Sequence, residues 1–414
     1  MSDKGVTVHT TKRERITTTV LWVLVAAVAA GMAFARLRDA TGDPTHGTDL
    51  ETFLAAARAA ARGGSVYEAT GYVYLPFLAW MLVPFAALPM EDVFAAWTAL
   101  SLAAALGAVA AVTATLWSGL RPWQRPVVAG VAVITLLYNS VLSLELWLGQ
   151  NDTLILLVAS LAVFFAGRRH SRLSGAMVGF GAVLKTWPGG LGLWLLRRGA
   201  PQPLRGLVGA AATGLAALLL VVIVAGPGEL IAWIRRTLAF SSQELVAYSV
   251  WGVGRQAFAD NGVMTPVVAD PTLGSIVAWA LAAIVVALIS VALRRPGTDS
   301  MAMWNIAAAV VMLIPVSHLW YRLLMLPVVW VWFATAVRRP RDPWAWATTA
   351  VAVLFWWTTF RLQPIDNQFT ENTTQYLLVM GAGLTMLVVS VAAAAAEDVR
   401  TGAAPPRRSH ASGR

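Results

Sequence analysis

Apolar stretches long enough to cross a lipid bilayer recur along almost the whole chain, and this recurrence limits the fold more than any single motif. By the criterion of roughly 20 apolar residues per helix, the sequence contains about twelve spans, at 16–37, 72–89, 92–117, 127–147, 153–167, 173–196, 206–226, 273–293, 302–320, 323–337, 344–360 and 375–396. The runs are continuous rather than alternating, which disfavours a β-barrel. With 58% hydrophobic and 13% charged residues among 414, the sequence predicts an all-α polytopic membrane protein with about 11–12 transmembrane helices.

The spans are predicted to form one transmembrane domain, residues 16–396. The first run is longer than the apolar segment of a cleavable signal peptide, which has roughly 7–15 residues, so we expect it to remain as the first span. Residues 1–15 then form a cytoplasmic N-terminal tail, and 397–414 a disordered cytoplasmic tail. Outer loops are expected at 38–71, 227–272 and 361–374. The chain has no cysteine, which excludes disulfides and thiolate sites.

The net charge of +10 comes almost wholly from arginine. Most basic residues lie in short clusters at span ends, at 12–15, 168–172, 197–198, 294–295, 338–341 and 407–408. Such clusters mark cytoplasmic loops, and without a basic stripe they argue against nucleic-acid binding. The clusters orient the C-terminal half of the chain. In the N-terminal half, strict alternation of the spans from a cytoplasmic N-terminus places Arg121, Arg125 and 168–172 on the outer side of the membrane. Either these loops violate the charge rule or one segment is re-entrant, with 173–196 and 72–89 as the candidates.

A polar segment between the first two apolar runs concentrates carboxylates. It carries Asp39, Asp43, Asp49, Glu51 and Glu68. Residues 49–62 are predicted to form an amphipathic helix on the outer interface, with an apolar stripe of Leu50, Phe53, Leu54, Ala57 and Ala61. Thr48-x-x-Glu51 fits a capping box at its start.

Asp49 is the candidate catalytic residue. An acidic side chain in the first turn of a helix can simply complement the helix dipole. The functional alternative is a carboxylate fixed at the membrane–water boundary, where partial desolvation raises its pKa. Such a carboxylate can act as a general base toward a sugar hydroxyl.

Lys185 and His318 are the most unusual polar residues within the apolar runs. A lysine at membrane depth costs roughly 2.5–3.5 kcal/mol; Lys185 either snorkels to an interface or binds a lipid phosphate. His318 either packs within the bundle, donates to a phosphate or acts as an acid that protonates the leaving group. Arg322, one helical turn later, is expected to share its face. Arg235 and Arg236 in the second outer loop are solvated or form phosphate forks.

The run Gly149-Gln150-Asn151-Asp152 interrupts the boundary between two spans. Its side chains either cap a helix or bond to sugar hydroxyls. The sequence has no nucleotide-binding or metalloprotease motif in a usable context and no histidine–carboxylate set with metal-ligand spacing. It therefore predicts no cofactor and no metal ligands, although a divalent ion at the acidic loop stays open.

Several short motifs, taken in their order along the chain, resemble glycosyltransferase family 87. They are Asp49-Leu-Glu-Thr-Phe53, Gly63-Gly-Ser-Val-Tyr67, Tyr74-Leu-Pro76, Gly149-Gln-Asn151, Gly181-Ala-Val-Leu-Lys185-Thr-Trp-Pro188 and Pro315-Val-Ser-His318, and the resemblance extends over residues 40–395. It implies a C-type glycosyltransferase architecture and a polyprenyl-phosphate sugar donor. It also implies a glycolipid or lipoglycan acceptor among the membrane lipids. The family includes mycobacterial mannosyltransferases of glycolipid synthesis, so the expected site is the outer face of the plasma membrane.

The same resemblance assigns roles to residues. It implies Asp49 as the general base of an inverting transfer, and Lys185, His318 and Arg235 or Arg236 as ligands of the donor phosphate. Arg322 is a further expected ligand of the donor phosphate, because it is expected to share the face of His318. Substrate contacts are expected from Tyr67, Tyr74, Gln150, Asn151, Trp320 and Tyr321. Two departures from the family pattern, Ser317-His-Leu-Trp-Tyr321 and Ser242-Gln-Glu-Leu245, leave the sugar and acceptor open.

The expected sugar is mannose, and three other functions compete with mannosyl transfer. The first is arabinofuranosyl transfer from decaprenyl-phosphoarabinose, which the sequence barely separates from mannosyl transfer. The second is a lipid or solute transporter, which would place charges in the middle of the bundle and show a duplicated plan. The third is a structural subunit of an envelope complex, which would not need Asp49. Polar residues gathered at one face favour an interfacial enzyme.

Overall fold

The computed structural model describes residues 11–43, 45–243, 247–262, 264–360 and 373–400. Within these ranges every regular element is helical. The α-helices are α1 (Lys12–Thr41), α2 (Thr48–Ala61), α3 (Pro76–Leu82), α4 (Met90–Leu116), α5 (Gln124–Leu137), α6 (Ser140–Leu148), α7 (Asp152–Gly167), α8 (Ser171–Leu184), α9 (Pro203–Ala225), α10 (Pro227–Gln243), α11 (Val250–Phe258), α12 (Pro271–Arg294), α13 (Asp299–Leu313), α14 (Pro327–Arg338), α15 (Pro343–Phe360) and α16 (Thr373–Arg400). The 3-10 helices are η1 (Val66–Glu68), η2 (Val83–Phe85), η3 (Trp187–Leu196) and η4 (Leu319–Met325).

The chain is an all-α polytopic membrane protein, as predicted. Among the residues described, six helices are long and apolar enough to cross a membrane, and a seventh span arises if α5 and α6, bent by 56°, count as one. Four further apolar helices have 10–17 residues. Several of the twelve predicted runs are therefore short or broken helices. The physical cause is that some residues inside these runs interrupt the helix. Asn139, for example, caps the start of α6 with its side chain, so that a new helix begins there.

One of the two proposed re-entrant segments leaves and returns on the same side. α8 ends before Lys185, whose backbone is extended, and η3 continues after the break. Pro188 explains the interruption, because the residues before a proline disfavour a continuing α-helix. The Ser171 hydroxyl donates to the Pro201 carbonyl oxygen at 2.8 Å, so both ends of the segment meet. The other candidate, 72–89, contains only the short α3 and η2.

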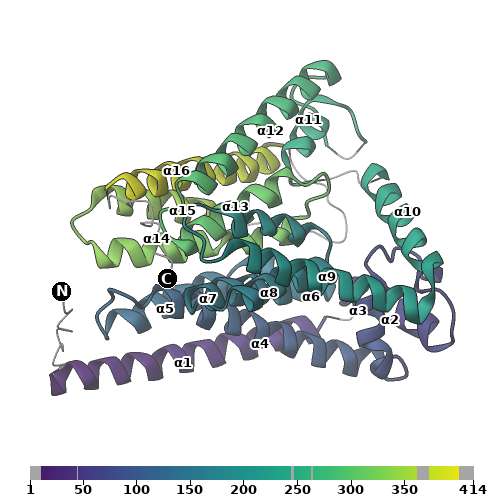
Figure 1. The fold of residues 1–414 in the computed structure, drawn as a ribbon, viewed down its shortest axis with the longest axis horizontal. Coiled ribbons are helices and arrows are strands. Elements are labelled where there is room, and N and C mark those ends of the chain that lie inside the picture. The colour runs from purple at the N-terminus through teal and green to yellow at the C-terminus, as the bar shows by residue number, and fades with distance from the viewer. Residues whose placement is uncertain (1–10, 44, 244–246, 263, 361–372, 401–414) are drawn as a thin grey trace, which may run out of the picture.

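The basic clusters that the structure describes, 12–15, 168–172, 197–198, 294–295 and 338–341, lie at one end of the helix bundle (Figure 1). Arg338 at the end of α14 donates to Leu116 at the end of α4, and Gln124 at the start of α5 donates to Val337. The backbone of Arg198 donates to Leu293 near the end of α12. α2, α3 and α10 lie at the opposite end. This arrangement removes the conflict in the predicted orientation of the N-terminal half, because Arg121, Arg125 and the 168–172 cluster lie with the other basic residues.

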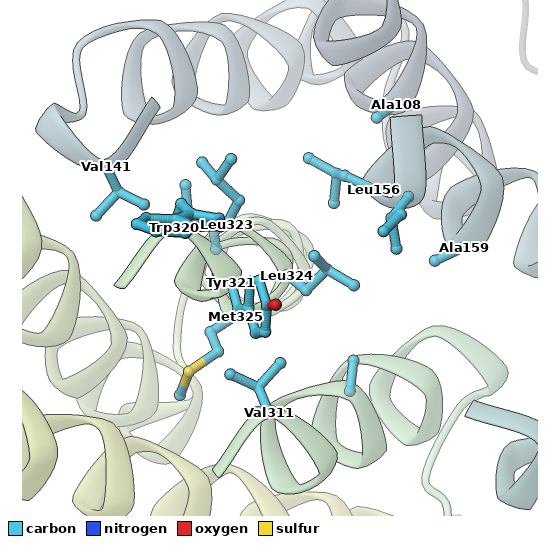
Figure 2. Packing of buried hydrophobic residues seen from close by; sticks show 14 of the residues in the cluster. Ala108, Val141, Leu156, Ala159, Val311, Trp320, Tyr321, Leu323, Leu324 and Met325 are labelled. Carbon is cyan, nitrogen blue, oxygen red and sulfur yellow. The ribbon is translucent and has the colours of Figure 1, made fainter. Parts of the chain in front are cut away.

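The middle of the molecule is built around η4. Figure 2 shows its apolar side chains surrounded by residues of four helices, namely Ala108 of α4, Val141 of α6, Leu156 and Ala159 of α7 and Val311 of α13. Leu323, Leu324 and Met325 of η4 are fully buried. The element is therefore a packing centre, and its first residues are held rigidly where they leave the core.

The outer segments differ in detail from their predicted form. α2 buries Leu50, Phe53, Leu54 and Ala57 as its stripe predicts, but Ala61 is exposed. The second outer loop contains helices α10 and α11. At the C-terminus α16 continues to Arg400 and Glu397 pairs with Arg339 at 2.5 Å, so residues 397–400 are helical rather than part of a tail. The loop 361–372, the stretch 244–246, which includes the last two residues of the Ser242–Leu245 run, and the termini 1–10 and 401–414 lie outside the described residues.

Candidate functional site

A cavity of about 600 Å³ lies at the end of the bundle that carries α2 and α10. Its walls come from α2, the segment before α3, the α6–α7 junction, the break after α8, α10 and the segment before η4. Seven of the residues expected at the site line it: Asp49, Tyr74, Gln150, Lys185, His318, Trp320 and Tyr321. Segments far apart in the sequence thus meet around one space.

Asp49 is placed by a turn rather than by a capping box. α2 starts at Thr48, and its N-cap is Gly47 with φ +79°, a conformation that glycine adopts without steric cost. No side chain caps the helix, so the predicted capping box is wrong, and Asp49 is the second helical residue rather than the first. The Gly47 amide donates to the Trp147 carbonyl oxygen at 2.7 Å. This bond fixes the start of α2 against the end of α6.

Asp49 and Asp43, two carboxylates of the outer segment 38–71, have opposite environments. Burial raises the pKa of Asp49 above its usual range, although the hydrogen bond from Gln150 and the charge of Lys185 act against this. Hydrogen bonds from Thr45 lower the pKa of Asp43. A carboxylate with a raised pKa that faces a cavity is suited to proton abstraction.

Gln150 connects the polar groups of the cavity. Its side-chain nitrogen donates to Asp49 Oδ2 at 2.5 Å, and its side-chain oxygen accepts from Lys185 Nζ at 3.2 Å. The Tyr74 hydroxyl donates to the same oxygen at 3.4 Å, and the Gln150 backbone oxygen accepts from the indole of Trp97 at 3.0 Å. The amide is therefore held in one orientation.

Lys185 reaches the cavity from the break between α8 and η3. It is 4% exposed, its Nζ lies 2.6 Å from Asp152 Oδ2, and it stands over the Tyr321 ring at 4.3 Å from the centroid. The ammonium group thus remains charged at depth because a carboxylate and an aromatic face replace water.

A second buried acidic residue lies next to Asp152, the partner of Lys185, and the sequence analysis missed it. Glu145 of α6 is fully buried, and its Oε1 accepts from the backbone amides of Asp152 at 2.5 Å and Thr153 at 3.1 Å. It therefore caps the N-terminus of α7. The available signal was an acidic residue inside the apolar run 127–147, which is expensive unless it is satisfied.

Aromatic side chains form part of the cavity wall. The rings of His318 and Trp320 stack with centroids 4.4 Å apart, and Trp187 stacks on Tyr321 at 5.2 Å. The indole nitrogens of Trp187 and Trp320 are buried and have no hydrogen-bond partner among the described residues. A ligand with acceptor oxygens in this part of the cavity would satisfy them.

Arg322 does not line the cavity. Its guanidinium donates to the Tyr248 carbonyl oxygen at 2.7 Å and contacts the sulfur atoms of Met325 and Met380. The expected shared face with His318 is wrong, because His318 is the N-cap of a 3-10 helix, where side chains four residues apart do not align.

Four other expected residues also lie away from the cavity lining. Arg235 and Arg236 are exposed on α10, and Arg236 donates to the Tyr67 carbonyl oxygen at 3.0 Å. The Tyr67 hydroxyl donates to the Tyr74 carbonyl oxygen at 2.9 Å, and Asn151 donates to Leu184 at 3.4 Å. These contacts brace the walls of the site.

The part of the chain that the structure describes has no candidate metal site, because no group of three or more histidine or acidic side chains there could hold an ion. The cavity offers one partly buried carboxylate with a raised pKa, one buried ammonium group and aromatic side chains. This set can bind a polar group attached to an apolar chain and remove a proton from a second ligand.

Comparison with known proteins gives a family. No curated protein matches the sequence, but the sequence model of glycosyltransferase family 87 matches residues 72–317. The matched stretch includes Tyr74, Gln150 and Lys185, begins after Asp49 and ends before His318. Because it covers more than half of the chain, the protein belongs to glycosyltransferase family 87.

Proposed function

We propose that the chain transfers mannose from a polyprenyl-phosphate donor to a lipid-linked glycan acceptor, with inversion at the anomeric carbon. Family membership supports glycosyl transfer. The observation that carries the proposed mechanism is the position of Asp49, a partly buried carboxylate that lines the cavity and is bonded to a neutral amide.

The reaction needs one base and one stabilised leaving group. Asp49 takes the proton of an acceptor hydroxyl, whose oxygen attacks the anomeric carbon from the face opposite the phosphate. The bond from the anomeric carbon to the phosphate oxygen breaks, and polyprenyl phosphate leaves with the electron pair. Positioned proton transfer of this kind contributes typically 10²–10⁴-fold to rate.

The departing phosphate requires positive charge and hydrogen-bond donors. Lys185 supplies the charge, and His318, Trp187 and Trp320, which line the same cavity, supply ring N–H groups. Preorganised donors at the point where charge develops are usually the largest single contribution to catalysis. Arg235, Arg236 and Arg322 are not part of this proposal, because none lines the cavity.

The apolar part of the cavity suits a polyprenyl chain. Leu238 and Phe240 of α10 and Ile314, before η4, line it. α10 also exposes Ile231 and Ile234, as an amphipathic helix at a membrane surface would.

The proposed location is the plasma membrane, with the cavity on the extracytoplasmic side. The basic clusters of the described residues lie at one end of the bundle, and α2 and α10, which line the cavity, lie at the other (Figure 1). Since basic residues concentrate on the cytoplasmic side of membrane proteins, the cavity faces outward. A lipid-linked donor, rather than a nucleotide sugar, is available there.

The test is sugar transfer by the purified protein in detergent. Polyprenyl-phosphate mannose, and separately the arabinose analogue, would be offered to a lipid extract from the source organism. Wild type would be compared with Asp49→Asn and with Glu51→Gln, an exposed acid on the same helix. Mannose transfer that depends on Asp49 but not on Glu51 supports the proposal. Transfer from the arabinose donor alone would change the assigned sugar from mannose to arabinose. No transfer from either donor by folded protein would contradict the proposed transferase function.

A further inference from the structure

Asp49 and Lys185 bond to opposite ends of one side-chain amide. Gln150 donates to Asp49 at 2.5 Å and accepts from Lys185 at 3.2 Å. The two charged groups are thus one amide apart in a cavity of low polarity, where an ion pair is strongly favoured once formed. Something must keep Lys185 from taking Asp49 as its partner.

The competing partner is Asp152. Its carboxylate is 2.6 Å from Lys185 Nζ and fully buried. Its own backbone is fixed, because its amide donates to Glu145 and begins α7. The backbone of Asp152 is therefore anchored, which limits how far its carboxylate can follow Lys185.

We propose that Asp152 is a positioning residue for the transfer reaction: it holds the ammonium group of Lys185, so that Asp49 stays bonded to neutral Gln150 and available to accept a proton. The inference rests on the proposed function, since Asp49 acts as the base only if the chain is a transferase. Glu145 supports Asp152 through the backbone and is a second positioning residue.

The surroundings of Asp49 define what a change at Asp152 would do. The charged and titratable groups that face it are Lys185, Asp152 and Tyr74, and His318 lines the same cavity. Only Lys185 among the first three carries positive charge. An opposite charge within contact distance lowers a carboxyl pKa by roughly 1–3 units. If Lys185 were released from Asp152, Asp49 would become a weaker base.

The first experiment is the pH dependence of kcat/KM for Asp152→Asn. The acidic limb should move to lower pH by about one unit or more, and the plateau rate should fall about tenfold or more as the base weakens. The double variant Asp152→Asn/Lys185→Met, which leaves no unpaired ammonium group, should return the limb to the wild-type position or above. Asp299→Asn, which breaks the other ion pair with a buried cation, Arg197, should leave the limb in place.

The second experiment does not depend on activity. Infrared titration follows the protonated carboxyl band of Asp49, identified by its absence in Asp49→Asn. Its midpoint should fall in Asp152→Asn and recover in the double variant. An unchanged midpoint in Asp152→Asn, or no recovery in the double variant, would overturn the positioning role. If wild type transferred no sugar, the proposed function would fail, and the infrared midpoints would still decide whether Asp152 separates the two charges.

Discussion

Lys185 and Asp152 form an ion pair of 2.6 Å in which both side chains are almost completely buried, 4% and 0% exposed. The pair joins the break after α8 to the first residue of α7. A buried pair is weak evidence for stability, because desolvation offsets much of the attraction, but removing one partner leaves an uncompensated charge. The pair therefore constrains which single substitutions the site tolerates.

Lys185→Met should destabilise the fold by about 3–5 kcal/mol, because it leaves Asp152 buried without its partner. Thermal unfolding in detergent would measure this as a lower midpoint temperature. Lys185→Met/Asp152→Asn, which removes both charges, should recover most of the loss. Equal midpoints for Lys185→Met and wild type would mean that the pair is not buried in the folded protein.

The transfer rate should fall on the acidic side of neutrality, because Asp49 must be ionised to accept a proton and burial raises its pKa. The acidic limb of kcat/KM should therefore lie above the usual carboxyl range and vanish with the activity in Asp49→Asn. A limb at the pKa of an exposed aspartate would contradict the burial of this group in the free enzyme.

The same raised pKa predicts the effect of Asp49 on stability. The folded protein holds the Asp49 proton more tightly than the unfolded chain. The contribution of this protonated carboxyl to the free energy of unfolding is therefore complete below the pKa of Asp49 in the unfolded chain, and it is lost as pH rises through the pKa in the folded protein. At neutral pH, Asp49→Asn should be at least as stable as wild type. Unfolding midpoints of both proteins across this range would check the sign; a less stable variant at neutral pH would oppose it.

Gly149→Ala should reduce both activity and stability. Gly149 has φ +73°, and an added Cβ would lie 2.7 Å from the Cβ of Leu50, the residue after Asp49. The backbone strain alone costs about 1–2 kcal/mol, and the clash pushes α2 away from Gln150. Gly63→Ala is the matched control, because Gly63 also has positive φ, +76°, but nothing lies within 4 Å of its added Cβ. Gly63→Ala should lose stability and keep its rate per folded molecule; equal loss of rate in both variants would argue against the contact with Leu50.

Trp187→Phe and Trp320→Phe should each raise the KM for the donor about tenfold, since one hydrogen bond to a charged group is worth roughly 1.5–3 kcal/mol. Phenylalanine keeps an aromatic ring and removes only the N–H. Trp304→Phe in α13 is the control, because its indole nitrogen is also buried without a partner among the described residues but does not line the cavity. If all three variants kept the wild-type KM, the cavity tryptophans would not contact the donor.

The sequence predicted the site best where a residue is unusual for its surroundings. Lys185 in an apolar run, and Gln150 at the boundary between two runs, were both recognisable as polar groups in an apolar context, and both line the cavity. Arg322 was misplaced because helical spacing was assumed where the chain forms a 3-10 helix. Glu145 was missed because its backbone partners become adjacent only when α6 turns into α7 at Gly149.

By itself the sequence determined the membrane class and the helical fold, because hydropathy acts locally along the chain. Only the tertiary structure decided which runs form helices long enough to cross a membrane, that the two ends of 171–201 meet, and that Gln150 stands between Asp49 and Lys185. These features depend on contacts between residues far apart in the sequence. Such contacts are selected by packing and by the need to satisfy every buried polar group, and neither requirement can be read from a single segment.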